Sequence, residues 1–289
     1  MNSSKIYVFF FMLVLISCST ESIGKSVVKE STMEIRPGEA RFLQVEKPSF
    51  LSKNTKLICR DAEFKYYTNG NYLEAYVVES YFSDMSPFKC ILKDGDKEVV
   101  ATQVKVEQKK FPEEKLKVDS RKVTLRAKDQ ARVAKEQVVL NKIYASSESA
   151  PLFKTSFMSP LKSYITSIYG IKRTYNRVKK SQHLGTDFRA GIGEKIPAAN
   201  RGKVVLSADL FFTGWTVIID HGLDIFTVYG HLSKTLVESG QIVQKGDLIG
   251  LSGSTGRSSG PHLHWGVKIH GQYIDGIDLV EQTKKQFKE

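Results

Sequence analysis

The placement of glycine is the feature that most constrains the fold of this chain. Of the 21 glycines among 289 residues, 14 lie between Gly170 and Gly260. They separate short apolar runs such as GKVVLSA, GWTVIIDHG and DIFTVYGHL. Short apolar runs bounded by turn residues are typical of strands. Residues 151–289 are therefore predicted to form an antiparallel β-sheet domain with tight turns.

Residues 33–110 also alternate strand-like runs with turns. Asn69-Gly70 and Asp94-Gly95 separate runs rich in Val, Tyr, Phe and Leu, and such dipeptides are the strongest short hairpin signals. Several short strands at this spacing predict a small, immunoglobulin-like β-sandwich, so the whole chain is expected to be mainly β. This region contains no histidine and offers no catalytic constellation.

A charged connector, residues 111–150, joins the two regions. Residues 105–142 hold twelve Lys or Arg and six Asp or Glu, a net +6 out of the chain's formal +12. The helical spacing of Ala127, Ala131, Ala134 and Val138 predicts a helix over about 127–145 with these residues as one stripe. The basic residues are most simply a solvated face, with contact to anionic envelope polymers as the alternative.

The first residues indicate export. Lys5 precedes an apolar run too short to span a membrane, as in a secretory signal peptide over residues 1–17. The run ends in Leu15-Ile16-Ser17-Cys18, which resembles the bacterial lipoprotein box and implies a lipid on Cys18 with residues 18–32 as a tether. Ser19, in place of Asp, implies sorting to the outer membrane, facing the periplasm. The alternative is an ordinary signal peptide with a chance cysteine.

The remaining cysteines fit an exported protein. Once Cys18 is lipidated, Cys59 and Cys90 are left, and an oxidising compartment permits a disulfide between them. Such a bridge would contribute about 3–4 kcal/mol on the loop-entropy argument. Two buried free thiols are the alternative.

All six histidines lie beyond residue 180. In GPHLHWGV, His262 and His264 would share one face of a strand, because side chains alternate between its two faces. In SQHLGTDF, His183 and Asp187 lie four apart and could bind one metal. A catalytic zinc needs about three protein ligands, and one histidine of the His-x-His pair could be the third. The alternative is a strand with two polar residues on an exposed face.

Together these stretches resemble the lysostaphin/LytM-type zinc endopeptidases, which cleave peptide bonds in bacterial peptidoglycan. The resemblance runs from about residue 153 to residue 279. It is carried by the His183-to-Asp187 motif, PAANRGKVV, GWTVIIDHG, YGHLS, KGDLIGLSGSTGRSSGPHLHWGV. It implies a substrate groove, Zn²⁺ bound by His183, Asp187 and His264, and a metal-free catalytic pair, His231 and His262. The proline common after the last strand is absent from YIDGIDL, which affects the domain edge.

The implied activity is hydrolysis of peptidoglycan crosslinks. Zinc lowers the pKa of bound water to about 7 and polarises a carbonyl, and a neutral histidine can take the water's proton. The bond could be a glycine bridge or a D-Ala-to-diamino-acid crosslink, and outer-membrane sorting favours the second. The alternative is a non-catalytic envelope regulator that activates other wall hydrolases, but such relatives usually lack one of the five key residues.

The other features predict ordinary roles. The basic charge alone would suit nucleic acid, but the export segment and the lack of a nucleic-acid motif argue against that partner. His221 is predicted to be a turn or packing residue, and His270 to lie on an exposed hairpin.

Overall fold

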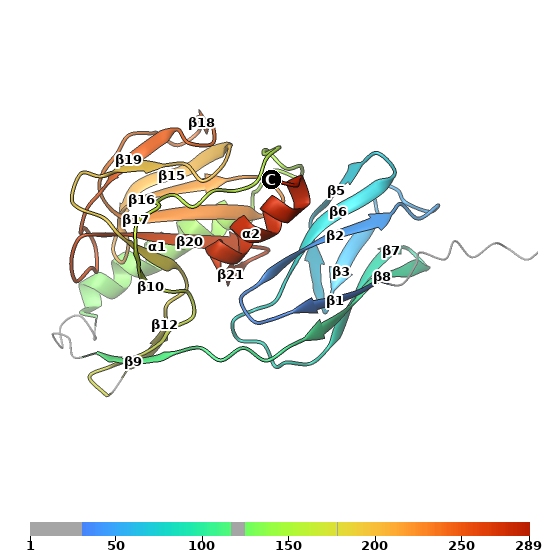
Figure 1. Cartoon of the computed structure of the whole chain (residues 1–289), viewed down its shortest axis with the longest axis horizontal. Coiled ribbons are helices and arrows are strands. Elements are labelled where there is room, and N and C mark those ends of the chain that lie inside the picture. The colour runs from blue at the N-terminus through green and yellow to red at the C-terminus, as the bar shows by residue number, and fades with distance from the viewer. Residues whose placement is uncertain (1–30, 117–124, 178) are drawn as a thin grey trace, which may run out of the picture.

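The computed structural model describes residues 31–116, 125–177 and 179–289. The fold is mainly β, as predicted, and Figure 1 shows the N-terminal sheets beside a larger C-terminal sheet. The predicted signal peptide, Cys18 and nearly all of the tether lie outside the described residues. Among the helices that the structure describes, none has the length and hydropathy of a membrane span.

Two sheets form the N-terminal region. In the first, the strand order is β1 (Ser31–Ile35), β8 (Lys97–Val106), β7 (Phe88–Asp94), β3 (Lys56–Cys59) and β4 (Ala62–Phe64). In the second, it is β2 (Ala40–Glu46), β6 (Tyr72–Val78) and β5 (Tyr66–Asn69). Apolar side chains of both sheets enter one buried core. The immunoglobulin-like topology stays a prediction.

The predicted disulfide is present in this region. Cys59 in β3 and Cys90 in β7 lie directly opposite each other in an antiparallel pair and are bonded. Both cysteines are buried. The bridge therefore joins two neighbouring strands inside the core of the N-terminal region.

The C-terminal sheet contains ten strands, and all of its pairings are antiparallel. Its main order is β10 (Ile165–Ser167), β13 (Thr186–Arg189), β20 (His262–Ile269), β17 (Ile225–Thr235), β16 (Gly214–Asp220), β15 (Gly202–Leu210) and β18 (Ile242–Val243). The remaining strands pair at its margins: β14 (Lys195–Pro197), β19 (Leu248–Ser252), β21 (Gln272–Ile274).

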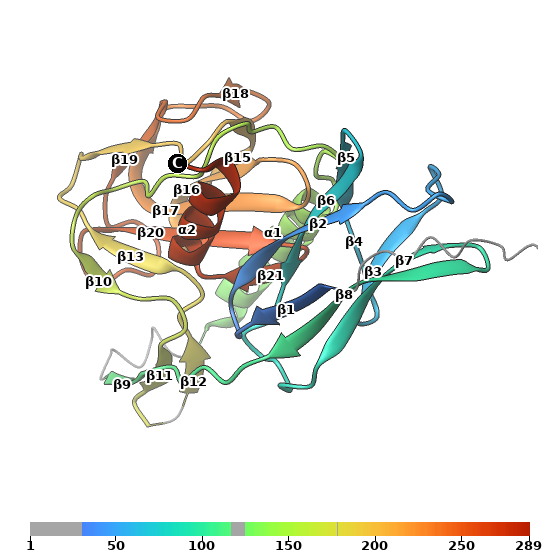
Figure 2. The same cartoon turned by 45° about the vertical axis from the view of Figure 1, so that its right-hand side comes forward.

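The connector forms more than the predicted helix. Its strand β9 (Glu113–Leu116) joins β11 (Lys172–Tyr175) and β12 (Lys179–Gln182) in a third small sheet. The pairing of β9 with β11 is parallel. This strand was not predicted, because its residues are mostly charged. The connector therefore runs against the segment that leads to His183 (Figure 2).

Helix α1 (Ala127–Tyr144) lies where a helix was predicted, but the predicted stripe was wrong. Ala127, Ala131, Ala134 and Val138 are exposed. The helix instead packs Leu140, Ile143 and Tyr144 near its C-terminal end against a cluster of Leu206, Ile218, Phe226 and Val228. These larger side chains bury more apolar area than alanines can, so they determine which face packs.

Helix α2 (Gly276–Phe287) lies between the C-terminal sheet and β2 (Figure 2). The Asp275 side chain caps it by accepting a hydrogen bond from the Ile277 amide at 3.0 Å. The carboxylate of Asp278 accepts a hydrogen bond from the Ala40 amide at 3.0 Å. The helix therefore ties the N-terminal region to the C-terminal sheet.

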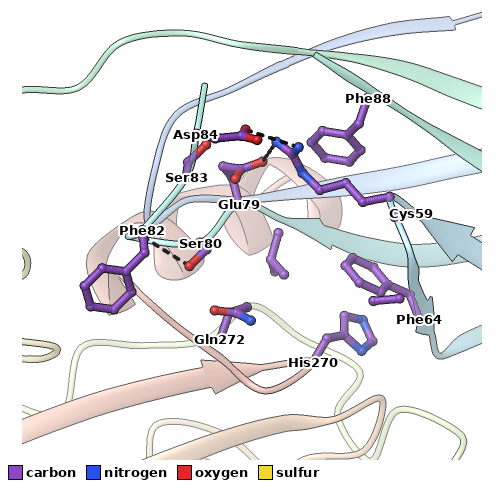
Figure 3. A pocket seen from close by; sticks show the side chains of 13 residues that line it. Cys59, Phe64, Glu79, Ser80, Phe82, Ser83, Asp84, Phe88, His270 and Gln272 are labelled. Atoms are coloured by element: carbon purple, nitrogen blue, oxygen red, sulfur yellow. Dashed lines mark hydrogen bonds and ion pairs between the residues drawn. The ribbon is translucent and has the colours of Figure 1, made fainter. Parts of the chain in front are cut away.

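His270 is the clearest departure from the sequence-based expectations. It was predicted to be exposed, but its side chain is only 2 % exposed. The imidazole stacks on Phe64 with ring centroids 4.3 Å apart. Asp224 lies 3.3 Å from its Nδ1 and also pairs with Lys65 at 2.9 Å. Figure 3 shows His270 at the edge of a cavity of about 300 Å³ between the two regions. The β20–β21 turn is covered because the N-terminal sheets pack on it.

Candidate metal centre

Strand pairing places the predicted site residues together. Strand β20 lies between β13 and β17. In this register Asp187 of β13 is directly opposite His264 of β20, and Gly230 of β17 lies opposite His264 from the other side. His231 follows Gly230, so three adjacent strands supply side chains to one place.

The alternation predicted for β20 is present. Leu263 and Trp265 are fully buried on one face. His262 and His264 share the other face and are partly exposed. The buried face packs into the core and fixes the strand, so that the histidine face is presented in one orientation.

Three of the predicted site residues bring their donor atoms to one point. His183 Nε2 lies 2.9 Å from Asp187 Oδ1 and 3.3 Å from His264 Nδ1. His264 Nδ1 lies 2.8 Å from the same carboxylate oxygen. Two ligand atoms on a tetrahedral zinc lie roughly 3.3 Å apart when the bonds are about 2.0–2.1 Å. The three distances are within about half an ångström of that geometry.

The hydrogen bonding of His183 shows why this arrangement fits a cation. Its Nδ1 lies 2.9 Å from the Ile168 carbonyl, which can only accept, so the proton is assigned to Nδ1. Nε2 then presents a lone pair to a carboxylate oxygen and another imidazole. A proton on His264 Nδ1 can bridge only one edge of this triangle, whereas a metal ion satisfies all three atoms.

Electrostatics favours the protonation state that a metal needs. Burial alone would raise the pKa of Asp187, but the adjoining His183 and His264 imidazoles outweigh it and hold that pKa well below its usual range. Burial lowers the pKa of His264. An ionised carboxylate beside a neutral imidazole is the state that coordinates a metal.

His231 and His262 form a second pair beside this triangle. Their ring centroids are 4.6 Å apart. His231 Nδ1 lies 2.7 Å from the Thr255 carbonyl, and His262 Nδ1 lies 2.9 Å from the Gly260 carbonyl. Both Nδ1 atoms are therefore assigned as donors, which leaves both Nε2 atoms able to accept a proton.

The backbone of His231 is held in an uncommon conformation. Its φ is +60°, in the left-handed region that non-glycine residues seldom adopt. Its amide donates to the Thr213 carbonyl at 2.6 Å, which helps to hold it there. Burial lowers the pKa of His231 to about 4, so this imidazole is neutral at pH 7. Strained backbone maintained by its surroundings is frequent at functional sites.

Gly185 leaves room for the His264 ring. A Cβ at this position would lie 2.5 Å from His264 Cε1. Any side chain at residue 185 would displace the imidazole. The glycine in the His183-to-Asp187 motif is thus required by close approach to the ring.

Arg173 was not predicted to lie near the site, whereas the role predicted for His221 was correct. Arg173 lies behind the site, with Nη2 at 3.6 Å from Asp187 Oδ2. No sequence signal separates it from the other basic residues around it. His221 is a packing residue, as predicted: it is fully buried, with Nδ1 2.8 Å from the Arg201 carbonyl and Nε2 2.8 Å from Thr227 Oγ1.

The family comparison agrees with this geometry. The model of peptidase family M23 matches residues 181–276, which include all five predicted site residues. This stretch is an M23 peptidase domain. A Vibrio cholerae relative, peptidoglycan DD-endopeptidase ShyA, is 40% identical over 114 residues, 39% of this chain and 26% of that protein. In Neisseria meningitidis, DD-carboxypeptidase/endopeptidase Mpg is 36% identical over 101 residues, 35% of this chain and 23% of that protein.

The likeness of fold extends beyond the M23 domain. A crystal structure from Pseudomonas aeruginosa, described as a peptidase M23, superposes with a TM-score of 0.65 at 24% identity. It covers 85% of this chain and 95% of that chain. The chain spans about a quarter of the length of the two curated relatives that it matches.

Proposed function

We propose that this protein is a zinc-dependent endopeptidase that hydrolyses peptide crosslinks of peptidoglycan. The observation that carries the proposal is the convergence of His183 Nε2, Asp187 Oδ1 and His264 Nδ1 beside the His231–His262 pair. The three donor atoms all lie within 4.8 Å of one another. Two imidazoles and a carboxylate form a donor set that zinc commonly takes, and a catalytic zinc keeps one position open.

The two groups of residues take different roles. His183, Asp187 and His264 would hold the metal, which would act as a Lewis acid and lower the pKa of a water. His231 and His262 face the site with unprotonated Nε2 atoms. One of them can accept the proton of the attacking water at Nε2. The other, once its Nε2 carries a proton taken from solvent, can protonate the leaving amine or stabilise the oxyanion.

The substrate follows from the relatives. ShyA and Mpg carry names that specify DD-endopeptidase or DD-carboxypeptidase/endopeptidase activity. We extend that class to this chain, so the bond cut is the D-Ala-to-diamino-acid crosslink rather than a glycine bridge. Mass spectrometry of muropeptides released from purified sacculi checks this, and release of glycine-bridge products alone would contradict it.

The cellular location of the protein is proposed from the predicted signal peptide and Cys18. A lipid on Cys18 would anchor the enzyme in the outer membrane, facing the periplasm and its peptidoglycan. A Cys18→Ala variant is expected to remain unprocessed or to become soluble. If it still fractionates with membranes as the unmodified protein does, the lipid anchor is wrong.

Two variants test the assignment of roles. His183→Ala removes one of three ligands and is expected to be zinc-poor and inactive. His231→Ala keeps all three and is expected to retain zinc while losing roughly 10²–10⁴-fold of its activity, the usual contribution of a general acid–base group. Zinc content by elemental mass spectrometry and hydrolysis of purified peptidoglycan are measured together, with His270→Phe as a control histidine away from the site.

Each result has a distinct meaning. Full zinc and full activity in His183→Ala would refute the metal site. Full activity in His231→Ala would leave the metal site standing but remove the two-histidine mechanism. If the unmodified protein binds zinc and peptidoglycan but hydrolyses nothing, it is the non-catalytic envelope regulator instead.

A further inference from the structure

The connector packs against the back of the proposed metal centre. In the parallel pair of β9 and β11, Glu114 lies next to Arg173. The Lys172 amide also donates to the Pro112 carbonyl at 2.9 Å. Figure 2 shows β9 beside β11, below the large sheet, at the end of a long extended segment from β8, with β12 on the other side of β11. A segment outside residues 181–276 thus contacts the part of the chain that leads to His183.

An aromatic contact fixes the start of this segment. Gly170 has a φ of +89°, and a Cβ there would lie 2.1 Å from Cδ1 of Phe111. The Phe111 ring therefore occupies the space that a side chain at residue 170 would need. Gly170 donates its amide to the His183 carbonyl at 2.7 Å, and His183 donates its amide to the Ile171 carbonyl at 2.9 Å. The backbone that holds His183 is covered by the connector.

Arg173 links the connector to two of the proposed ligands. Its Nε lies 3.3 Å from Glu114 Oε2, and its Nη2 donates to Ser167 Oγ at 2.6 Å. The same Nη2 lies 3.6 Å from Asp187 Oδ2. Ser167 Oγ is in turn 3.2 Å from His183 Nδ1, the nitrogen whose proton leaves Nε2 free to bind. The Arg173 side chain is 19% exposed.

We propose that Arg173 is a positioning residue for the metal centre and that Glu114 of the connector holds it in place. This inference rests on the proposed function. It makes docking of the connector on β11 a condition for tight metal binding. If β9 separates from β11, Arg173 loses its contact with Glu114 and no longer orients Ser167 and Asp187.

The geometry of arginine matters for this role. A guanidinium is a planar fork that reaches several acceptors at fixed angles, whereas a lysine ammonium is a point charge on a flexible stem. Groups that orient metal ligands typically change metal affinity by about 10–100-fold when removed. Glu114 acts one step further away, and it also offsets a positive charge that would otherwise repel a cation.

The chain offers a matched control for Glu114. Glu113 is the preceding residue of β9 and carries the same charge. Its side chain is 72% exposed, and among the described residues it forms an ion pair only with Lys172, at 4.0 Å. Glu113→Gln and Glu114→Gln therefore make the same chemical change on the same strand, and only the second removes the contact with Arg173.

The test measures zinc affinity of the full chain by competition with a chromophoric chelator. Glu114→Gln is expected to bind zinc about two- to fivefold more weakly, the factor for a partly exposed ion pair. Arg173→Ala and Arg173→Lys are expected to lose about 10–100-fold, and Glu113→Gln to match the unmodified protein. The unfolding temperature of the metal-free proteins is measured in parallel, and Glu113→Gln and Glu114→Gln are expected to agree there.

The outcomes separate this inference from the proposed function. If the unmodified protein binds no zinc, the proposed function itself fails. If it binds zinc but Glu114→Gln and Arg173→Ala bind as tightly as it does, only the inference is overturned. Full affinity in Arg173→Lys would show that charge alone is needed, and would overturn the positioning role.

Discussion

Buried carboxylates have different surroundings in the N-terminal region and at the proposed metal centre of the C-terminal sheet. In the N-terminal sheets Glu39, Glu74 and Glu79 are each 3% exposed. Glu39 pairs with Arg36 at 2.9 Å, Glu79 pairs with Arg60 at 3.2 Å, and Glu74 accepts from Gln44 Nε2 at 2.7 Å. Each acceptor has a donor within the protein. Such groups stabilise a fold because burial without a partner would cost free energy.

In the C-terminal sheet the buried carboxylate of Asp187 has a different environment, whereas that of Asp220 accepts hydrogen bonds from Ser147, Glu148 and Gly222. Asp187 meets His183 Nε2, whose proton is assigned to the other ring nitrogen. Acceptor therefore faces acceptor at the centre of the site. The chemical type of a buried residue therefore does not distinguish structure from function. What sets Asp187 apart is that one of the atoms facing its carboxylate, His183 Nε2, is itself an acceptor.

Removing the Cys59–Cys90 disulfide tests whether the stability of the N-terminal region and metal binding are independent. The double variant Cys59→Ala/Cys90→Ala is expected to lose about 3–4 kcal/mol of unfolding free energy, as the loop of 31 residues is no longer closed in the unfolded state. Urea unfolding measures the loss. Zinc bound per folded molecule is expected to stay unchanged, because both cysteines lie in a different sheet from β13 and β20. Loss of zinc without loss of stability would contradict the separation.

Gly170 lies where the connector covers the C-terminal region. Gly170→Ala is expected to cost roughly 2–4 kcal/mol, because the new methyl group both strains a positive φ and overlaps the Phe111 ring. Gly193→Ala is the control, since Gly193 has a similar φ of +86° but nothing within 4 Å of an added Cβ. That variant is expected to cost only about 1 kcal/mol. Thermal unfolding measures both losses of stability. Equal losses in the two variants would show that overlap with the Phe111 ring does not contribute.

The dependence of stability on pH also differs between the two regions, because the N-terminal region has no histidine. Burial lowers the pKa of His221 to about 4 from an unfolded value of 6.5. The unfolded chain thus binds more protons at pH 5, and stability falls as the pH drops from about 6.5 toward 4. Between pH 7 and pH 5 this one residue is expected to remove about 2 kcal/mol from the free energy of unfolding.

The matching variant isolates His221 from the other buried histidines. His221→Gln is expected to be less stable than the unmodified metal-free protein at pH 7 but to show a shallower decline toward pH 5. Urea unfolding at each pH gives both slopes. Parallel slopes would show that His221 does not titrate in this range.

Local pattern was sufficient for some features and not for others. Side-chain alternation placed His262 and His264 on one face of β20, because it depends only on neighbouring residues. Glycine spacing predicted an antiparallel C-terminal sheet for the same reason. The metal site followed from a family resemblance, and its register, Asp187 opposite His264, comes from pairing between segments 77 residues apart.

The features that sequence missed all depend on contacts between distant segments. His270 is buried because Phe64, from the other region, stacks on it. The face of α1 that packs is determined by the apolar cluster it contacts, and not by the alanine stripe predicted from the sequence. Strand β9 is charged and short, and its partner Arg173 lies 59 residues beyond Glu114. Periodicity contains no information about such partners.

The register of β13 against β20 has a consequence for the order of events during folding. Asp187 and His264 face each other only when these two strands have paired. Contacts between segments so far apart in sequence form late, since the intervening chain must first be ordered. The nascent polypeptide therefore has no complete binding site until its last long strand is in place. The proposed zinc would then bind only after assembly is complete, and the free energy of its coordination would secure the closed chain against reopening.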